Sequence, residues 1–368
     1  MFLPVVKPIV RTACRIASFV LYALTLLAAF GGHINPAFIT FPVFFVTAMP
    51  YFVIATSIVI LVWLLCGRWI TAGIGIFTLF VAWSPITTAI PLNFAKKASP
   101  DAVTFKVLTY NILHGDDQEK GNEAPGNRSF EYVINSGADI VCLQEVIDLN
   151  DPNEIHNLHE FQDSLLKVYP YQAGNAYNDK KVLSKYPVRM IHHDAFFGPG
   201  DNYWFSAYKV TIKGRELTLI NIHLNSMSLS DKERDLFKTI AKGNGKEAMS
   251  ELKGSIMNKF HNRTVYRADR TAALRRAIDK VNGPLIICGD FNDVPESYCY
   301  RLLRGDDLRD AYVETSFGPL VTYNRHAFWF HLDQIFYRGP LQALSVKKGH
   351  IRSSDHYPLL AEFEFTNK

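Results

Sequence analysis

The sequence predicts an α/β domain preceded by an all-α group of about three membrane-spanning helices. Residues 1–100 contain no Asp or Glu, and Arg68 is the only formal charge between Ile16 and Ala95. A soluble domain needs a charged, solvated surface, so this composition indicates a membrane segment. After Asp101, short apolar runs rich in Val, Ile, Leu and Phe end in polar residues and alternate with helical patterns. Such runs are typical of buried strands in an α/β fold.

A helix that spans a membrane needs about 20 mostly apolar residues. Residues 16–32, 41–65 and 70–90 fit this requirement, and a four-residue turn containing Arg68 predicts a hairpin between the last two. The alternative is a cleaved signal peptide followed by a soluble core. A signal peptide explains one of the three apolar stretches and leaves the other two unexplained. We assign residues 1–97 to a membrane anchor with three spanning helices.

Basic residues predict the orientation of this multi-pass membrane protein. Three of them precede the first span and Arg68 lies between the second and third. Placing all four on the cytoplasmic side sends the third span outward, so residues 98–368 are expected to be extracytoplasmic. Lys96 and Lys97 directly follow the third span and favour the opposite orientation. Two spans instead of three would also reverse it.

The α/β part of the chain has a nearly balanced charge. The whole chain has 39 Lys and Arg, of which six precede residue 101, so 33 remain against all 35 Asp and Glu. This near-neutral balance offers no general electrostatic footprint for nucleic acid. The five cysteines form neither an evenly spaced framework nor a CxxC pair, so the sequence indicates neither disulfides nor zinc.

One segment of the α/β part departs from the strand pattern. Residues 230–265 are expected to form a helical insertion, in which Met249, Leu252, Ile256 and Phe260 recur at helical spacing. The segment is rich in Lys and Arg. It is either a solvated insertion packed on the edge of the domain or a basic face for anionic headgroups or a polyanionic substrate.

Polar side chains follow the apolar runs, where an α/β sheet gathers its chemistry. Taken singly, each has an ordinary explanation as a turn residue, a cap or a surface charge. Together they predict one site, and its candidate residues are Asn111, Glu145, His223, Asn225, Asp290, Asn292, Asp333, Asp355 and His356.

The segments "TYNIL", "CLQEV", "IHLNS", "GDFND", "LDQIF" and "SDHYP", in this order, resemble the endonuclease/exonuclease/phosphatase superfamily. That superfamily includes deoxyribonucleases, apurinic endonucleases, inositol polyphosphate phosphatases and neutral sphingomyelinases. The resemblance covers residues 101–365. It implies a two-layer sandwich of mixed β-sheets flanked by helices, and metal-dependent hydrolysis of a phosphate ester.

The chemistry of the residues agrees with this resemblance. Glu145 supplies a hard oxygen ligand of the kind that Mg²⁺ or Mn²⁺ prefers. The resemblance adds Asn111 and Asp355 as metal ligands. Asp290 and Asn292 are two residues apart, so on an extended chain they project to the same side. There Asp290 could hold or deprotonate the attacking water while the Asn292 amide grips a phosphoryl oxygen.

Histidines complete the predicted site. His356 could donate to a phosphoryl oxygen or serve as a general base, and Asp333 resembles the family residue paired with it. His223 resembles an acid used by the deoxyribonuclease and sphingomyelinase branches, and Asn225 is a candidate phosphate contact. Gly289 is expected to let the backbone approach the scissile phosphate closely. We expect the catalytic residues to be His223, Asp290, Asn292, Asp333 and His356, and the phosphate contacts to be Asn225, Asn292 and His356.

One departure limits the transfer of specificity. Some nucleases of the family place a carboxylate two residues after the first asparagine, where this chain has Leu113. This argues against a direct transfer of apurinic endonuclease specificity.

Three functions remain open from the sequence. The leading hypothesis is a membrane-anchored phosphodiesterase that acts on a phospholipid headgroup or an inositol phosphate beside the lipid bilayer. A nuclease acting on DNA or RNA is an alternative with the same anchoring, and the second hypothesis keeps the enzyme but puts its domain in the cytoplasm, facing nucleotides or nucleic acid. The third is a membrane scaffold that keeps the fold without turnover, which would predict damaged site residues.

Overall fold

The structure is a computed structural model of the chain. It describes residues 3–116, 118, 127–146, 158–174, 179–191, 204–226, 246–325 and 328–366. The first part of the predicted insertion, residues 230–245, lies outside the described residues.

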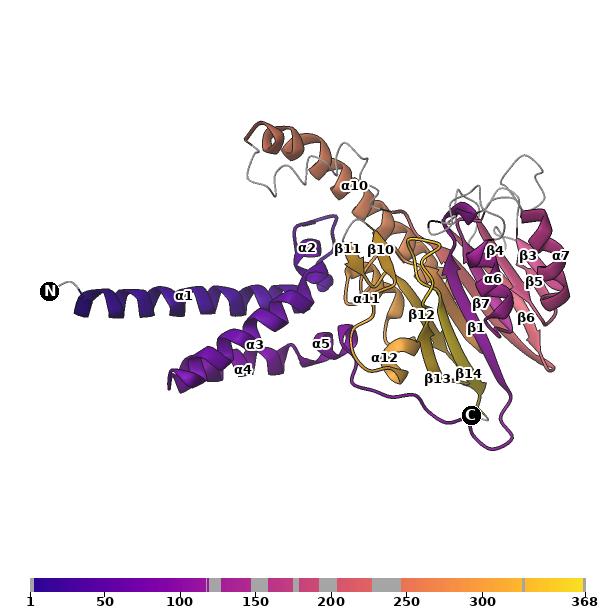
Figure 1. Cartoon of the computed structure of the whole chain (residues 1–368), viewed down its shortest axis with the longest axis horizontal. Coiled ribbons are helices and arrows are strands. Elements are labelled where there is room, and N and C mark those ends of the chain that lie inside the picture. The colour runs from indigo at the N-terminus through magenta and orange to yellow at the C-terminus, as the bar shows by residue number, and fades with distance from the viewer. Residues whose placement is uncertain are drawn as a thin grey trace.

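Helices at the N-terminus project to one side of a pair of stacked sheets (Figure 1). α1 extends away from the sheets, and α3 packs beside α4 and against α1. The helices of this region are α1 (Leu3–Phe30), the short 3₁₀ helix η1 (Gly31–His33), α2 (Pro42–Thr47), α3 (Met49–Leu65), α4 (Trp69–Val81) and α5 (Trp83–Ala89).

The expectation of three continuous spans is wrong. Among the described residues, Pro8–His33 is the one helix long and apolar enough to cross a membrane by itself. The predicted second span divides into α2 and α3, and Pro50 occupies the first turn of α3, where the missing N–H is tolerated. The predicted third span divides into α4 and α5, which are bent by 62° and pass the same test only together.

Within the described residues, the strands of the α/β domain form two six-stranded sheets, and each contains one parallel pair. The first sheet has the order β13-β14-β1-β2-β4-β3. Its strands are β1 (Thr104–Asn111), β2 (Ile140–Gln144), β3 (Tyr171–Gly174), β4 (Lys180–Ser184), β13 (Leu341–Lys348) and β14 (Leu359–Phe365).

The second sheet has the order β5-β6-β7-β8-β12-β9. Its strands are β5 (Val188–Met190), β6 (Phe205–Ile212), β7 (Arg215–His223), β8 (Leu285–Asp290), β9 (Arg309–Asp310) and β12 (Asp333–Arg338). A separate hairpin is formed by β10 (Tyr323–Arg325) and β11 (Phe328–Phe330). The predicted sandwich of two mixed sheets is confirmed.

Alternating side chains build one core between the sheets and one on each outer face. On β1, Val107 faces the second sheet, whereas Leu108 and Tyr110 pack under the helices of the first sheet. Those helices are α6 (Arg128–Asn135) and α7 (Leu158–Val168). The outer core of the second sheet lies under α10 (Lys246–Ile278) and α11 (Tyr298–Arg304). The remaining short helices are η2 (Leu113–Gly115) and α12 (Ala311–Thr315).

The second half of the predicted insertion continues without a break into the residues that follow it, as one helix, α10. Its C-terminal half contributes Leu274 and Ile278 to the core of the second sheet. Its N-terminal half extends beyond the sheets on the side of the N-terminal helices (Figure 1). The helix therefore belongs to the fold along one half of its length and projects from it along the other.

Burial of His331 predicts a pH-dependent stability. Its side chain is buried beside Tyr312, Nε2 has no partner among the described residues, and burial lowers its pKa to about 3. The unfolded chain therefore binds this proton first, and stability is lost as pH falls below about 6.5. We expect the wild type to lose about 2 kcal/mol from this group between about pH 7 and pH 5.

The measurement is the free energy of unfolding in denaturant for the wild type and for His331→Gln at both pH values. The variant should lose less stability on acidification, whatever its stability at neutral pH. His350→Gln, at an exposed position, is the control and should keep the wild-type dependence. Equal acid sensitivity of wild type and His331→Gln would contradict the assignment.

Candidate active site

At one edge of the sandwich, the side chains that face the space between the sheets change from apolar to polar. Along β8, Cys288 belongs to the inner core, and the next residue on the same face is Asp290. In the same way Asn111 continues the inward row of β1, His223 that of β7 and Asp333 begins that of β12. Because side chains in a strand alternate between faces, the periodicity that builds the core also points these four residues inward.

Strand register places three of them side by side. β7 is parallel to β8 with His223 opposite Asp290, and β12 is antiparallel to β8 with Asp333 opposite Asp290. Opposite residues on one face lie close enough for their side chains to interact. Asp333 is thus the first residue of its strand and not the last, because an antiparallel neighbour begins where β8 ends.

Asn111 connects the two sheets. Its Nδ2 donates to Glu145 Oε1 at 2.9 Å and to Asp290 Oδ2 at 3.1 Å, and its Oδ1 accepts from the Leu113 amide at 3.1 Å. Glu145 directly follows β2, which is parallel to β1. The fully buried amide therefore holds one carboxylate from each sheet in a fixed relation.

The loop after β8 departs from the extended chain expected for it. Asn292 has a φ of 48°, so the prediction that it projects from an extended strand is wrong. The two side chains still meet, because the Asn292 amide N–H donates to Asp290 Oδ1 at 2.8 Å and its Nδ2 donates to Asp290 Oδ2 at 3.1 Å. This is an Asx-type turn, and Nδ2 also donates to the Leu224 carbonyl at 2.8 Å.

Gly289 has a different role from the expected one. Its φ is 141°, and a Cβ atom built there would lie 2.0 Å from the carbonyl oxygen of Ile222 on β7. The glycine thus allows the backbones of β7 and β8 to approach each other. The close neighbour of Gly289 is therefore the backbone of β7, where the sequence analysis expected a phosphate.

His356 is held between two carboxylates. Its Nδ1 lies 2.8 Å from Asp333 Oδ2, and its Nε2 lies 3.5 Å from Asp290 Oδ2. Burial opposes the charged ring, but Asp333 and Asp290 outweigh it and raise the pKa of His356 to about 10. At neutral pH the ring is therefore a cation and a hydrogen-bond donor, so of its two predicted roles the donor role fits.

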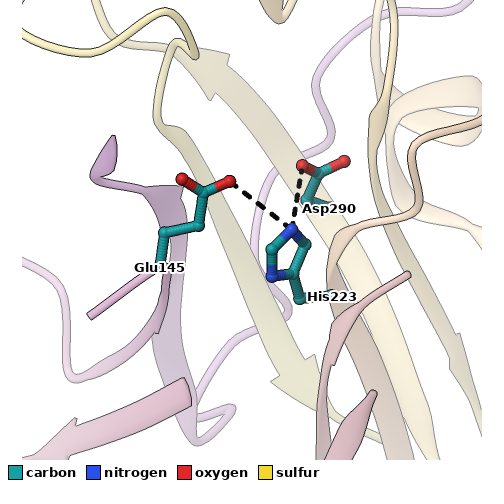
Figure 2. A group of neighbouring side chains, drawn as sticks. All are labelled: Glu145, His223 and Asp290. Atoms are coloured by element: carbon teal, nitrogen blue, oxygen red, sulfur yellow. Dashed lines mark ion pairs between the residues drawn. The ribbon is translucent and has the colours of Figure 1, made fainter. Parts of the chain in front are cut away.

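A second histidine, His223, faces both Asp290 and Glu145 (Figure 2). Nε2 of His223 lies 3.5 Å from Glu145 Oε1 and 3.9 Å from Asp290 Oδ2. Its Nδ1 is hydrogen-bonded to Asp179, which in turn pairs with the buried Lys180. Burial lowers the pKa of His223, but Asp179, Asp290 and Glu145 outweigh it, so its pKa is raised.

The sequence did not suggest Asp179. Asp179 directly precedes β4, whereas the sequence pattern pointed to polar residues that follow an apolar run. β4 is antiparallel to β2, so Asp179 at its start lies at the same edge as Glu145 after the end of β2. A search of both ends of each apolar run would have included it, although only the pairing of the strands selects it.

Comparisons with known proteins assign the chain to a family. The model of the endonuclease/exonuclease/phosphatase family matches residues 108–356. The chain belongs to this family. No curated protein matches it.

Solved structures of the family are similar to the chain. A protein of the family from Bacteroides thetaiotaomicron has 16% identity and a TM-score of 0.47, covering 72% of this chain and 99% of its own. A humanized TDP2 from D. rerio has 15% identity and a TM-score of 0.47, covering 71% and 98%. Truncated TDP2 from Caenorhabditis elegans has 19% identity and a TM-score of 0.43, covering 71% and 98%. Likenesses this distant carry no argument about the substrate.

In this member of the family, neither Asp355 nor Asn225 is hydrogen-bonded to Glu145, Asp290 or the two histidines among the described residues. Asp355 Oδ2 is paired with Arg325 at 3.2 Å, and its predicted role as a metal ligand stays a prediction. Asn225 lies in the loop after β7, where its buried Oδ1 has no hydrogen-bond partner among the described residues. Its predicted contact with phosphate also stays a prediction.

The residues of the site fit a hard divalent cation. Ligand atoms of Glu145, His223 and Asp290 lie within 4.8 Å of one another, and those of Asp290, Asp333 and His356 form a second such group. Carboxylate oxygens are the donors that hard cations prefer. The carboxylates are therefore the ligands on which a cation would depend.

Strained backbone surrounds these carboxylates. Glu145 has a φ of 51°, Asn292 of 48° and Glu296 of 65°, in the left-handed region that non-glycine residues rarely adopt. Such conformations cost roughly 1–3 kcal/mol each and persist where the surrounding structure fixes them. Strain at Glu145 and Asn292 sets the directions in which their side chains meet Asn111 and Asp290.

Asp179 predicts the protonation state of His223. We expect Asp179→Asn to lower the pKa of His223, because the variant removes one hydrogen-bonded negative charge from the ring. The measurement is a pH titration of the His223 ring resonances by NMR. Glu216→Gln is the control, because Glu216 pairs with Lys209 on the exposed part of β6 and β7. An unchanged His223 titration in Asp179→Asn would refute the pairing.

Proposed function

We propose that the protein is a membrane-anchored, divalent-metal-dependent phosphodiesterase. The observation that carries the proposal is the arrangement around Asp290. His223 and His356 lie on either side of its Oδ2, and each has a carboxylate partner of its own, Asp179 and Asp333. The His356 cation and a second histidine with a raised pKa, beside a buried carboxylate, suit a reaction in which a dianionic transition state forms and a proton is moved.

The cofactor of the proposal is Mg²⁺ or Mn²⁺, with Glu145 as the residue that would hold it and Asn111 as the residue that orients Glu145 through Nδ2. Such an ion would neutralise charge on the phosphoryl group. Asp355 remains the third predicted ligand. Hard oxygen donors and the absence of thiolates among the grouped residues support this choice of metal over zinc.

The chain's own residues can carry the proton transfers. Asp290 accepts a proton from water as the water oxygen forms its bond to phosphorus. The bond between phosphorus and the leaving oxygen breaks, and His223 supplies a proton to that oxygen. The His356 cation holds a phosphoryl oxygen meanwhile, Asn292 orients Asp290 through its N–H groups, and Asp333 keeps the His356 ring oriented through Nδ1.

Exposed apolar side chains support a lipid bilayer as a partner. Only 28% of the apolar window of α1 is buried, and α3 and α4 also present large apolar side chains to the outside. Exposed apolar surfaces of this extent mark membrane or protein contacts. A domain held at a bilayer would meet phospholipid headgroups or inositol phosphates first, so we place these before DNA and RNA as substrates.

Hydrolysis of bis(4-nitrophenyl) phosphate by the purified full chain tests the chemistry. We expect turnover with Mg²⁺ or Mn²⁺, its loss in EDTA, and a fall of roughly 10²- to 10⁴-fold in Asp290→Asn, because the proton acceptor is removed. Sphingomyelin vesicles, inositol phosphates and plasmid DNA, assayed in parallel, rank the substrate classes.

Asp279→Asn is the matched control, because Asp279 is an exposed partner of Arg275 on α10 and should leave turnover unchanged. Hydrolysis of no substrate with any divalent metal would favour the non-catalytic scaffold. Equal hydrolysis by wild type and Asp290→Asn would assign the activity to a contaminant.

A compartment-sensitive reporter fused after Lys368 tests the topology. With α1 as the one spanning helix, the basic residues that precede it predict that the α/β domain is extracytoplasmic. We expect signal only from a reporter that is active outside the cytoplasm. The fusion protein should also stay in the membrane fraction after alkaline extraction. Signal confined to the cytoplasm would support the nuclease hypothesis instead.

A further inference from the structure

The turn that follows α1 lies directly on the loop that follows the catalytic strand β8. We call residues 31–44 the docking turn and residues 290–297 the catalytic loop. A Cβ atom built on Gly32 would lie 1.9 Å from the carbonyl oxygen of Glu296 and 3.0 Å from the next backbone atoms. The two backbones are therefore in contact, and any side chain at Gly32 would displace one of them.

A polar chain continues this contact. His33 accepts a hydrogen bond from Arg301 through Nε2, while its Nδ1 lies 3.0 Å from the Phe30 carbonyl. Arg301 also pairs with the buried Glu296, and Arg304 lies 3.8 Å from the same carboxylate. His33 thus contacts the arginine that fixes the strained end of the catalytic loop.

The docking turn meets α10 as well. Phe44 stacks on Phe260 with ring centroids 4.4 Å apart, and Thr40 Oγ1 is hydrogen-bonded to His261 Nδ1 at 2.5 Å. About two helical turns further along α10, the buried Arg267 lies 3.4 Å from Asp293 of the catalytic loop. α10 is therefore a rigid connection between the turn and the opposite flank of the loop.

Arg267 also reaches the second loop of the site. Its NH1 donates to the Asn225 carbonyl at 3.2 Å. The docking turn therefore lies against the catalytic loop at Glu296 and, through α10, at Asp293 and Asn225. Asn292, which orients Asp290, directly precedes Asp293 on the loop and has a left-handed backbone.

We propose that the docking turn positions the catalytic loop, with Gly32 and His33 as the positioning residues, so that the N-terminal helices hold Asn292 and Asp290 in register as well as tethering the domain. The effect on turnover rests on the proposed function. The effect on the geometry of the loop does not.

The test compares Gly32→Ala with Gly73→Ala in the full chain in detergent micelles. A Cβ atom at Gly73 would meet nothing within 4 Å, so this helix glycine in the N-terminal region is a matched control. We expect Gly32→Ala to accelerate hydrogen-deuterium exchange in peptides covering residues 290–301 and to leave exchange of β1 and β14 unchanged. Mn²⁺ binding, measured by electron paramagnetic resonance, should weaken as well.

For bis(4-nitrophenyl) phosphate, kcat should fall about 10- to 100-fold with KM little changed, because Asn292 and Asp290 would lose their alignment. Gly73→Ala should match the wild type in all three measurements. Wild-type exchange, Mn²⁺ binding and kcat in Gly32→Ala would overturn the proposal.

His33→Ala keeps the proposal testable if Gly32→Ala does not fold. It removes the contact with Arg301 without adding volume, so exchange at residues 290–301 should rise to a smaller extent. Unchanged exchange in this variant would also overturn the proposal. If the wild type hydrolyses nothing, the exchange data still decide whether the docking turn positions the catalytic loop. Failure of the proposed function is therefore distinguishable from failure of the positioning proposal.

Discussion

The alternation of side chains along the inner strands is the constraint on which the site depends. One face of β1, β7, β8 and β12 supplies the core between the sheets, and the polar residues at the edge continue that same face. A shift of one residue in any of these pairings would turn the polar side chain to the outer face and expose the core. The apolar burial that stabilises the sandwich therefore also fixes the relative positions of Asn111, His223, Asp290 and Asp333.

Much of this organisation can be predicted from the sequence because the inner strands are long, apolar and end abruptly. Six ordered segments located the strands and their polar ends, and the structure brings Asn111, Glu145, Asp290 and His356 together as expected. Local composition also located the apolar N-terminal region. These features depend on periodicity and composition, which a single sequence displays directly.

Other features depend on pairing or backbone conformation, which composition does not determine. Asp179 enters the site because β4 runs antiparallel to β2, and Asn292 reaches Asp290 through a left-handed turn. The breaks at Ala48 and Ala82 divide apolar stretches that look continuous by hydropathy. Asp355 lies against Arg325 on a hairpin strand whose position no local pattern specified. In each case tertiary geometry outweighs the local signal.

The left-handed residues of the site have a consequence for how such a sequence evolves. Glycine would adopt the backbone of Asn292 or Glu296 with less strain, so selection for heat resistance alone would drift both positions toward glycine. The side chains present there make contacts that glycine would lack: Asn292 orients Asp290, and Glu296 pairs with Arg301. A glycine at either position would relax the backbone and remove that contact.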